Sequence, residues 1–194
     1  MSATSTALMT AEELMQLPRG YYRAELINGE LITMPLPGLP QGRAAMRLGA
    51  PLAQFVRDHD LGEVYIADVG FQLTRTPDTV VGPDISFISK ERLGQAGDVM
   101  GYWQGPPDLA VEVYSAGYRP GKVSKRISRL FSFGIKQVWI ADLKHRTVAV
   151  NRSESDITTF SGSDYLEAQD LFPGFRLSLD QIFGATPGTV KEST

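Results

Sequence analysis

The chain has 194 residues, of which 42% are hydrophobic, and this is enough to bury the core of one ordinary domain. It contains no cysteine, which excludes disulfides, thiolate-bound zinc and thiol nucleophiles. The net charge of -3 argues against a broad, non-specific nucleic-acid binder, because Lys and Arg contacts to phosphate supply most of that affinity. Any nucleic-acid site must therefore be a local patch.

No signal peptide and no run of about 18 apolar residues is evident in the sequence. These observations predict a cytoplasmic protein without membrane association. We expect a single domain over residues 8–184, with disordered tails at residues 1–7 and 185–194.

The first predicted elements are a short helix and a hairpin. Thr10 and Glu13 have the spacing of a capping box, which predicts that a helix begins after Thr10. Asn28 and Gly29 tolerate the positive φ angles of a tight turn and therefore predict a hairpin. The strands of this hairpin are expected at residues 23–27 and 30–34.

A proline-rich loop and a helix follow. Residues 35–42 predict the loop, and residues 43–60 predict a helix that Gly49 and Pro51 should bend or interrupt. Runs of β-branched and aromatic residues bounded by Gly, Pro and Asp then predict three strands. These are residues 62–67, 69–74 and 83–89.

The second half of the chain predicts a strand, a helix and a strand in succession. The strand at residues 107–115 precedes a helix at 122–133, which ends at Gly134, and a second strand at 137–142. This order implies a right-handed crossover between parallel strands. A further strand at 147–152 and a short helix at 179–183 complete the pattern. The expected fold class is α/β, a mixed sheet flanked by helices.

Two carboxylates stand out in the predicted strands. Glu112 lies in a run that otherwise resembles a buried strand, where a glutamate is costly unless it is paired or bound to a cation. The alternative is that alternation places Glu112 on a polar sheet face. Asp84 opens another apolar strand, where it could face a cleft or simply be exposed. Glu25 is a third candidate, although a surface charge on the hairpin would also explain it.

If the three carboxylates converge, a cation must neutralise them or their pKa values must rise. Magnesium is the natural ion, since it takes carboxylate oxygens and completes its shell with water and substrate phosphate. His59 and His145 are the only histidines and stand beside charged residues, so a histidine-rich zinc or iron site is not expected. A GxSxG nucleophile motif is also absent from the sequence.

A basic segment follows the Glu112 strand. Residues 119–129 contain no acidic residue, which gives a net-acidic protein one positive face. A solvated helix surface would explain these charges, and phosphate recognition is the functional alternative. The basic residues are Arg119, Lys122, Lys125, Arg126 and Arg129.

The sequence resembles the Uma-type restriction endonuclease family, bacterial proteins of the PD-(D/E)XK nuclease superfamily. The resemblance extends over most of the chain, through the segments TAEEL, AELINGEL, VGPDISFIS, PPDLAVEVYS, GIKQVWIAD and LFPGFRL. It implies a restriction-endonuclease-like core, with Asp84 and Glu112 as ligands of Mg²⁺ or Mn²⁺ and Glu25 as an auxiliary acid. It also implies DNA as the substrate and phosphodiester hydrolysis by a metal-activated water.

The sequence departs from the superfamily pattern in two places. The superfamily usually has a lysine two residues after the glutamate, where this chain has Tyr114. In the Uma-type family that lysine is moved to the following helix, in register with Arg126 and next to Lys125. Arginine can stabilise phosphate charge but cannot act as a base. The second departure is the AGY sequence at residues 116–118.

Helical phase distinguishes the two candidate cations. At about 100° per residue, Val123, Ile127, Leu130 and Phe131 form one stripe that should pack on the sheet. Lys125 then lies about 175° from the centre of the stripe and Arg126 about 85° from it. We therefore expect Arg126 to reach the site and Lys125 to face solvent.

These residues are compatible with two functions. One is a metal-dependent DNA endonuclease that uses Asp84, Glu112, Glu25 and a helix cation, with Lys122, Arg129 and Arg119 on DNA phosphates. The other is a catalytically impaired protein of the same fold that binds nucleic acid or a protein partner. A homodimer would suit a nuclease that cuts both strands of a two-fold symmetric target.

Overall fold

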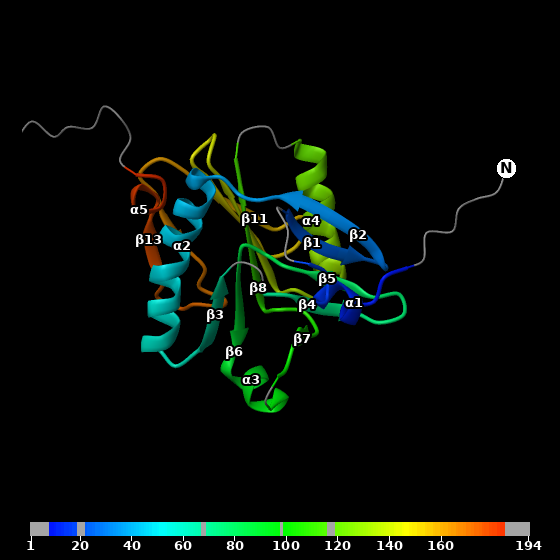
Figure 1. Ribbon diagram of the computed structural model, residues 1–194. Helices are drawn as coiled ribbons and strands as arrows, with labels where there is room; N and C mark the ends of the chain where they lie inside the picture. Colours follow the sequence, from blue (N-terminus) through cyan, green and yellow to red (C-terminus); the bar gives the residue numbers. More distant parts are fainter. Residues whose placement is uncertain (1–7, 19–21, 67–68, 98, 116–118, 185–194) are drawn as a thin grey trace, which may run out of the picture.

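The computed structural model describes residues 8–18, 22–66, 69–97, 99–115 and 119–184. The two predicted tails and residues 116–118 lie outside the described residues. Figure 1 shows the arrangement of the elements. The helices are α1 (Ala11–Met15), α2 (Leu39–Asp58), α3 (Lys90–Ala96), α4 (Pro120–Ser132) and α5 (Leu179–Phe183). The strands are β1 (Tyr22–Ile27), β2 (Glu30–Pro35), β3 (Gly62–Ile66), β4 (Phe71–Thr74), β5 (Thr79–Val81), β6 (Ile85–Ser89), β7 (Trp103–Gln104), β8 (Leu109–Tyr114), β9 (Gln137–Asp142), β10 (Thr147–Asn151), β11 (Ile157–Phe160), β12 (Tyr165–Glu167) and β13 (Arg176–Ser178).

A six-stranded mixed sheet forms the centre of the fold, with the order β11-β10-β9-β8-β6-β3. Strands β8 and β9 are parallel and are connected through α4, as the strand, helix, strand pattern predicted. The other neighbouring pairs in this sheet are antiparallel. The predicted mixed sheet flanked by helices is therefore confirmed.

Each face of this sheet packs against a different layer, because the side chains of β8 and β9 alternate between the two faces. Val111 and Trp139 belong to one core, with the apolar stripe of α2 and the C-terminal segment around α5. Ala110 and Ile140 belong to a second core, with Leu130 of α4. Glu112 is on the same face as Ala110, so it lies beneath α4.

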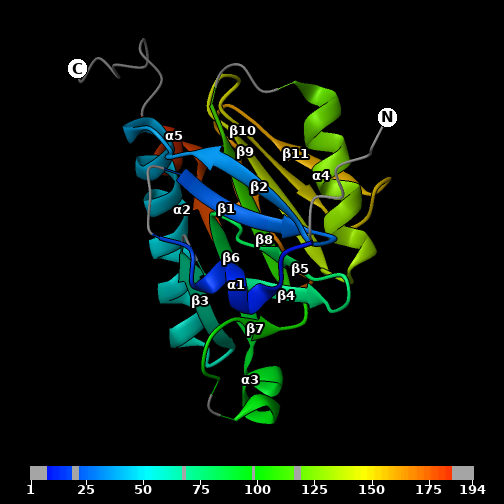
Figure 2. The same cartoon turned by 45° about the vertical axis from the view of Figure 1, so that its right-hand side comes forward.

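A second, five-stranded sheet has the order β2-β1-β5-β4-β7. Its hairpin turns at Asn28 and Gly29, which both have positive φ as predicted. Strand β1 pairs with β5 only at Leu26 and Val80. Figure 2 shows this hairpin in front of the six-stranded sheet, between α2 and α4. The hairpin of β1 and β2 therefore lies next to both the six-stranded sheet and α4.

Helix α2 differs from the sequence prediction. It begins at Leu39 rather than residue 43, with Pro40 in its first turn, and it continues through Gly49 and Pro51. Proline removes a helix hydrogen bond, but a buried stripe of Ala44, Leu48, Leu52 and Val56 holds the helix on the sheet. A Cβ added at Gly49 would lie 3.4 Å from Ile66 and Ile85, which is ordinary van der Waals contact, so α2 packs closely on these strands without requiring glycine. Within the described residues, no helix combines the length and apolarity needed to cross a membrane.

Candidate carboxylate and guanidinium site

Strand β8 places Glu112 in the interior of the protein. Glu112 is 8% exposed and lies between buried strand neighbours. The face that carries it packs under α4 rather than facing solvent. The interpretation of Glu112 as part of a polar sheet face is therefore wrong, because Ala110 on the same face is fully buried.

Asp84 lies directly before β6 and contacts two other elements. Its Oδ1 accepts a hydrogen bond from Arg23 Nη1 at 2.5 Å, and its Oδ2 accepts one from the Val113 backbone amide at 2.7 Å. The second bond fixes Asp84 next to the residue that follows Glu112. Asp84 is therefore a partly buried, paired carboxylate and not an exposed strand start.

Glu25 reaches the same region from β1. It is 3% exposed, so a surface charge on the hairpin is the wrong interpretation. Its Oε1 accepts a hydrogen bond from the Gly82 amide at 2.8 Å, and the carbonyl of Gly82 accepts one from Arg23 Nη2 at 2.6 Å. Two side chains of β1, Arg23 and Glu25, thus bind both polar groups of Gly82, two residues before Asp84.

Arg126 of α4 joins the two buried glutamates. Its Nη1 and Nη2 donate to Oε2 and Oε1 of Glu25 at 2.6 and 2.7 Å, which is a bidentate pair. Its Nε donates to Oε1 of Glu112 at 2.9 Å, and Nη2 lies 2.8 Å from the same oxygen. One guanidinium therefore connects a glutamate of each sheet.

The charges in this site shift two pKa values. Burial raises the pKa of Glu112 from 4.5 to about 7, and the negative charges of Asp84 and Glu25 add to the rise, while Arg126 opposes it. Burial alone would lower the pKa of Arg126, but the two glutamates outweigh it and raise that pKa above its ordinary value. Arg126 consequently stays charged, and Glu112 is the group that titrates near neutral pH.

The structure thus brings together four of the predicted site residues, which are Asp84, Glu112, Glu25 and Arg126. Lys125 is exposed on the other side of α4, while Val123, Ile127 and Phe131 pack against the core. The geometry expected from helical phase is observed, and the catalytic role of Arg126 stays a prediction. The residues predicted to contact phosphate or to be solvated in this segment are exposed: Arg119, directly before α4, and Lys122, Lys125 and Arg129 on it.

Sequence reasoning missed Arg23 and Gln41. Arg23 is the cation bound to Asp84, and Gln41 Nε2 donates to the Val113 carbonyl at 3.4 Å. The alternation of β1 could have identified Arg23, because it places Arg23 and Glu25 on one face of the strand. Gln41 had no such signal, since residues 35–42 read as a loop.

Comparison with known proteins gives a family for this chain. The family model described as "Putative restriction endonuclease" (Uma2) matches residues 11–180. The chain belongs to the Uma2 family. The family match confirms the resemblance inferred from the sequence. No curated protein matches the chain.

A solved structure supports the fold of this Uma2 protein. It is a crystal structure from Anabaena variabilis, described as a "putative nuclease belonging to DUF820". The match has a TM-score of 0.75 and 21% sequence identity, and it covers 90% of this chain and 97% of that chain. At this identity the likeness shows a shared fold. Family and fold together support a nuclease.

Restriction-endonuclease-like proteins generally use a divalent metal, and the donors of this Uma2 protein fit one. Asp84 and Glu112 offer carboxylate oxygens, which suit Mg²⁺ or Mn²⁺. Both contacts from Arg126 to Glu112 go to Oε1. In the described part of the chain, no group of three or more His, Cys, Asp or Glu side chains is arranged to hold a metal. Magnesium does not require such a group, because it is often bound by one or two carboxylates, water and substrate phosphate.

Proposed function

We propose that this Uma2 protein is a metal-dependent DNA endonuclease that hydrolyses phosphodiester bonds. The observation that carries the proposal is the buried arrangement of Glu112, Glu25 and Arg126, with Asp84 bonded to the backbone beside Glu112. Three carboxylates face two guanidinium groups, so ionised Glu112 leaves the site with an excess negative charge. A divalent cation would remove that excess and favour the ionised form of Glu112.

Each residue has a distinct role in this proposal. Asp84 and Glu112 would hold Mg²⁺ or Mn²⁺. The bound ion would supply a Lewis acid and a water of lowered pKa. Arg126 would stabilise charge on the phosphate, and it cannot itself take a proton from water. Glu25 is a positioning residue, because its bidentate pair fixes the orientation of the Arg126 guanidinium.

The exposed basic face of α4 would bind the DNA backbone. Lys122 and Arg129 are exposed on the helix that carries Arg126, and Arg119 is exposed directly before it. Phosphate contacts of this kind position DNA without reading its sequence. Action on DNA agrees with the cytoplasmic location predicted from the sequence, and a homodimer would allow cleavage of both strands.

One observation favours the alternative, a catalytically impaired protein that binds nucleic acid or a protein partner. Arg126 already forms ion pairs with both Glu25 and Glu112, and it stands where the family has a lysine. If the arginine replaces the metal as the counter-charge, the site would bind an ion weakly and cut nothing.

Plasmid nicking at low salt with Mg²⁺ or Mn²⁺ separates the two functions. The endonuclease proposal predicts cleavage by the wild-type protein that is lost with a chelator and in the Asp84→Asn variant. Asp156→Asn is the matched control, because Asp156 is exposed on the β10–β11 hairpin and has no contact with the four site residues among the hydrogen bonds and ion pairs of the described residues. Calorimetry should show Mn²⁺ binding that Glu112→Ala removes. Absence of both cleavage and metal binding would establish the impaired alternative.

A further inference from the structure

A cavity of about 490 Å³ adjoins the carboxylate site. Three of its lining residues, Arg23, Glu25 and Gly82, are also the residues that tie β1 to the segment before Asp84. Its volume is within the range of about 300–1,000 Å³ that is typical of small-molecule sites. The space is therefore large enough for an organic group, and it shares Arg23 and Glu25 with the proposed site.

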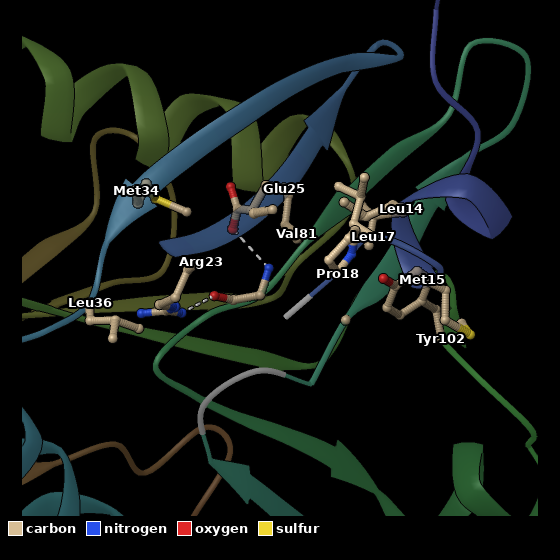
Figure 3. A pocket seen from close by; sticks show the side chains of 14 residues that line it. Leu14, Met15, Leu17, Pro18, Arg23, Glu25, Met34, Leu36, Val81 and Tyr102 are labelled. Atoms are coloured by element: carbon tan, nitrogen blue, oxygen red, sulfur yellow. Dashed lines mark hydrogen bonds between the residues drawn. The ribbon is translucent and has the colours of Figure 1, made fainter. Parts of the chain in front are cut away.

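The two ends of this cavity are apolar. Figure 3 shows Arg23 and Glu25 between Met34 and Leu36 on one side and Leu14, Met15 and Tyr102 on the other. Tyr102 is held against Gly70, since a Cβ added at Gly70 would lie 2.2 Å from the tyrosine ring. The Cδ1–Cε1 edge of the ring thus lies against Gly70, and the ring lines one end of the cavity with the thioether of Met15 beside it.

An aromatic ring and a thioether suit the face of a nucleobase. Bases unstacked from a strand are held by stacking on aromatic side chains and by contact with apolar groups. Methionine sulfur also contacts aromatic rings favourably and adapts to their shape. Because every base has such a face, this end of the cavity would accept bases with little discrimination among them.

We propose that the Tyr102 end of this cavity binds one unstacked base of the DNA strand whose phosphate lies at the carboxylate site. This inference rests on the proposed nuclease function and names its substrate more closely: a nucleotide that is single-stranded or displaced from a duplex. Arg23, between the cavity and Asp84, places positive charge where the strand passes from the base to the phosphate. Arg23, Glu25 and Gly82 belong both to the cavity and to the contacts beside Asp84. A group bound in the cavity would therefore lie next to a phosphate at the carboxylate site, as a base of the same DNA strand would.

The test compares a fluorescein-labelled single strand of deoxythymidine nucleotides with a strand of equal length that contains abasic nucleotides. Binding is measured by fluorescence anisotropy with Ca²⁺ in place of Mg²⁺. The wild-type protein should bind the intact strand more tightly, and Tyr102→Ala should weaken that binding by about fivefold or more. Tyr102→Phe keeps the ring and should keep the preference.

Met15→Glu tests the same end of the cavity through a residue that is 51% exposed, so it does not depend on the folding of the Tyr102 variant. It should abolish the preference for intact bases. Met46→Glu is the matched control, because Met46 is 57% exposed on α2 and does not line the cavity. Its preference should equal that of the wild type.

Equal binding of the intact and abasic strands by the wild type would overturn the base site. A preference that survives in both Tyr102→Ala and Met15→Glu would also overturn it. If the wild type binds the two strands equally but still cleaves plasmid, the nuclease proposal stays in place. Conversely, a base preference without any cleavage would refute the nuclease and retain the site.

Discussion

The pKa of Glu112 predicts how the stability of the protein changes with pH. That pKa is raised from 4.5 to about 7 in the folded protein. The folded state therefore binds more protons than the unfolded chain between these two values, and the free energy of unfolding falls as pH rises through this window. At about 1.4 kcal/mol per pH unit, the 2.5-unit difference corresponds to a loss of roughly 3 kcal/mol by neutral pH.

Urea denaturation of wild type and Glu112→Gln at pH values from 4 to 8 measures this loss. The glutamine cannot titrate, so the unfolding free energy of wild type minus that of Glu112→Gln should fall by about 3 kcal/mol across the range. Taking the difference cancels the contributions of other carboxyl groups to the pH dependence, such as those of Asp78 and Asp108, whose pKa values are lowered. Added Mg²⁺ should reduce the fall, because a bound cation favours the ionised carboxylate.

Glu30→Gln is the control for this experiment, since Glu30 is exposed on the neighbouring β2 strand. Its difference from wild type should stay nearly constant with pH. A constant difference for Glu112→Gln as well would show that Glu112 does not hold its proton to neutral pH in the folded protein. The electrostatic description of the site would then be wrong.

Two further predictions concern α4. Arg126→Ala should abolish plasmid cleavage. Arg126→Lys should retain or raise it, because lysine is the residue that the sequence resemblance implies for this position. Lys125→Ala should have nearly no effect. Loss of cleavage in Lys125→Ala but not in Arg126→Ala would contradict the observed orientation of the helix. For DNA binding, Lys122→Ala and Arg129→Ala should each reduce the slope of log K against log salt by about one unit. An unchanged slope in anisotropy titrations would show that this face does not contact the DNA backbone.

Much of the site could be predicted because it depends on local periodicity. The helical period of residues 122–133 was sufficient to direct Arg126 inward and Lys125 outward. Glu112 could be recognised because a glutamate in an apolar strand needs a partner. In both cases the signal lies within one element and its neighbours.

The rest depends on contacts between distant segments. The burial of Glu25 follows from the packing of the hairpin beside α4, which strand alternation does not reveal. The continuity of α2 through Pro51 reflects its buried stripe, so tertiary packing overrides a local helix-breaking signal. The predictions also missed β5, because its three residues follow a turn and are too short for a periodic pattern.

The single backbone pairing between β1 and β5 has a consequence for every charge-changing experiment on this protein. On one side of Leu26 and Val80 the Gly29 amide still donates to the Asp78 carbonyl, whereas on the other side the side chains of Arg23 and Glu25 bind the backbone of Gly82. These two side chains tie β1 to the segment before β6, so their removal would loosen a structural junction as well as alter the chemistry. Arg126 contacts the side chain of Glu112, and Glu112 does not bind Gly82. Substitution of Glu112 therefore best separates an effect on the chemistry from an effect on the junction.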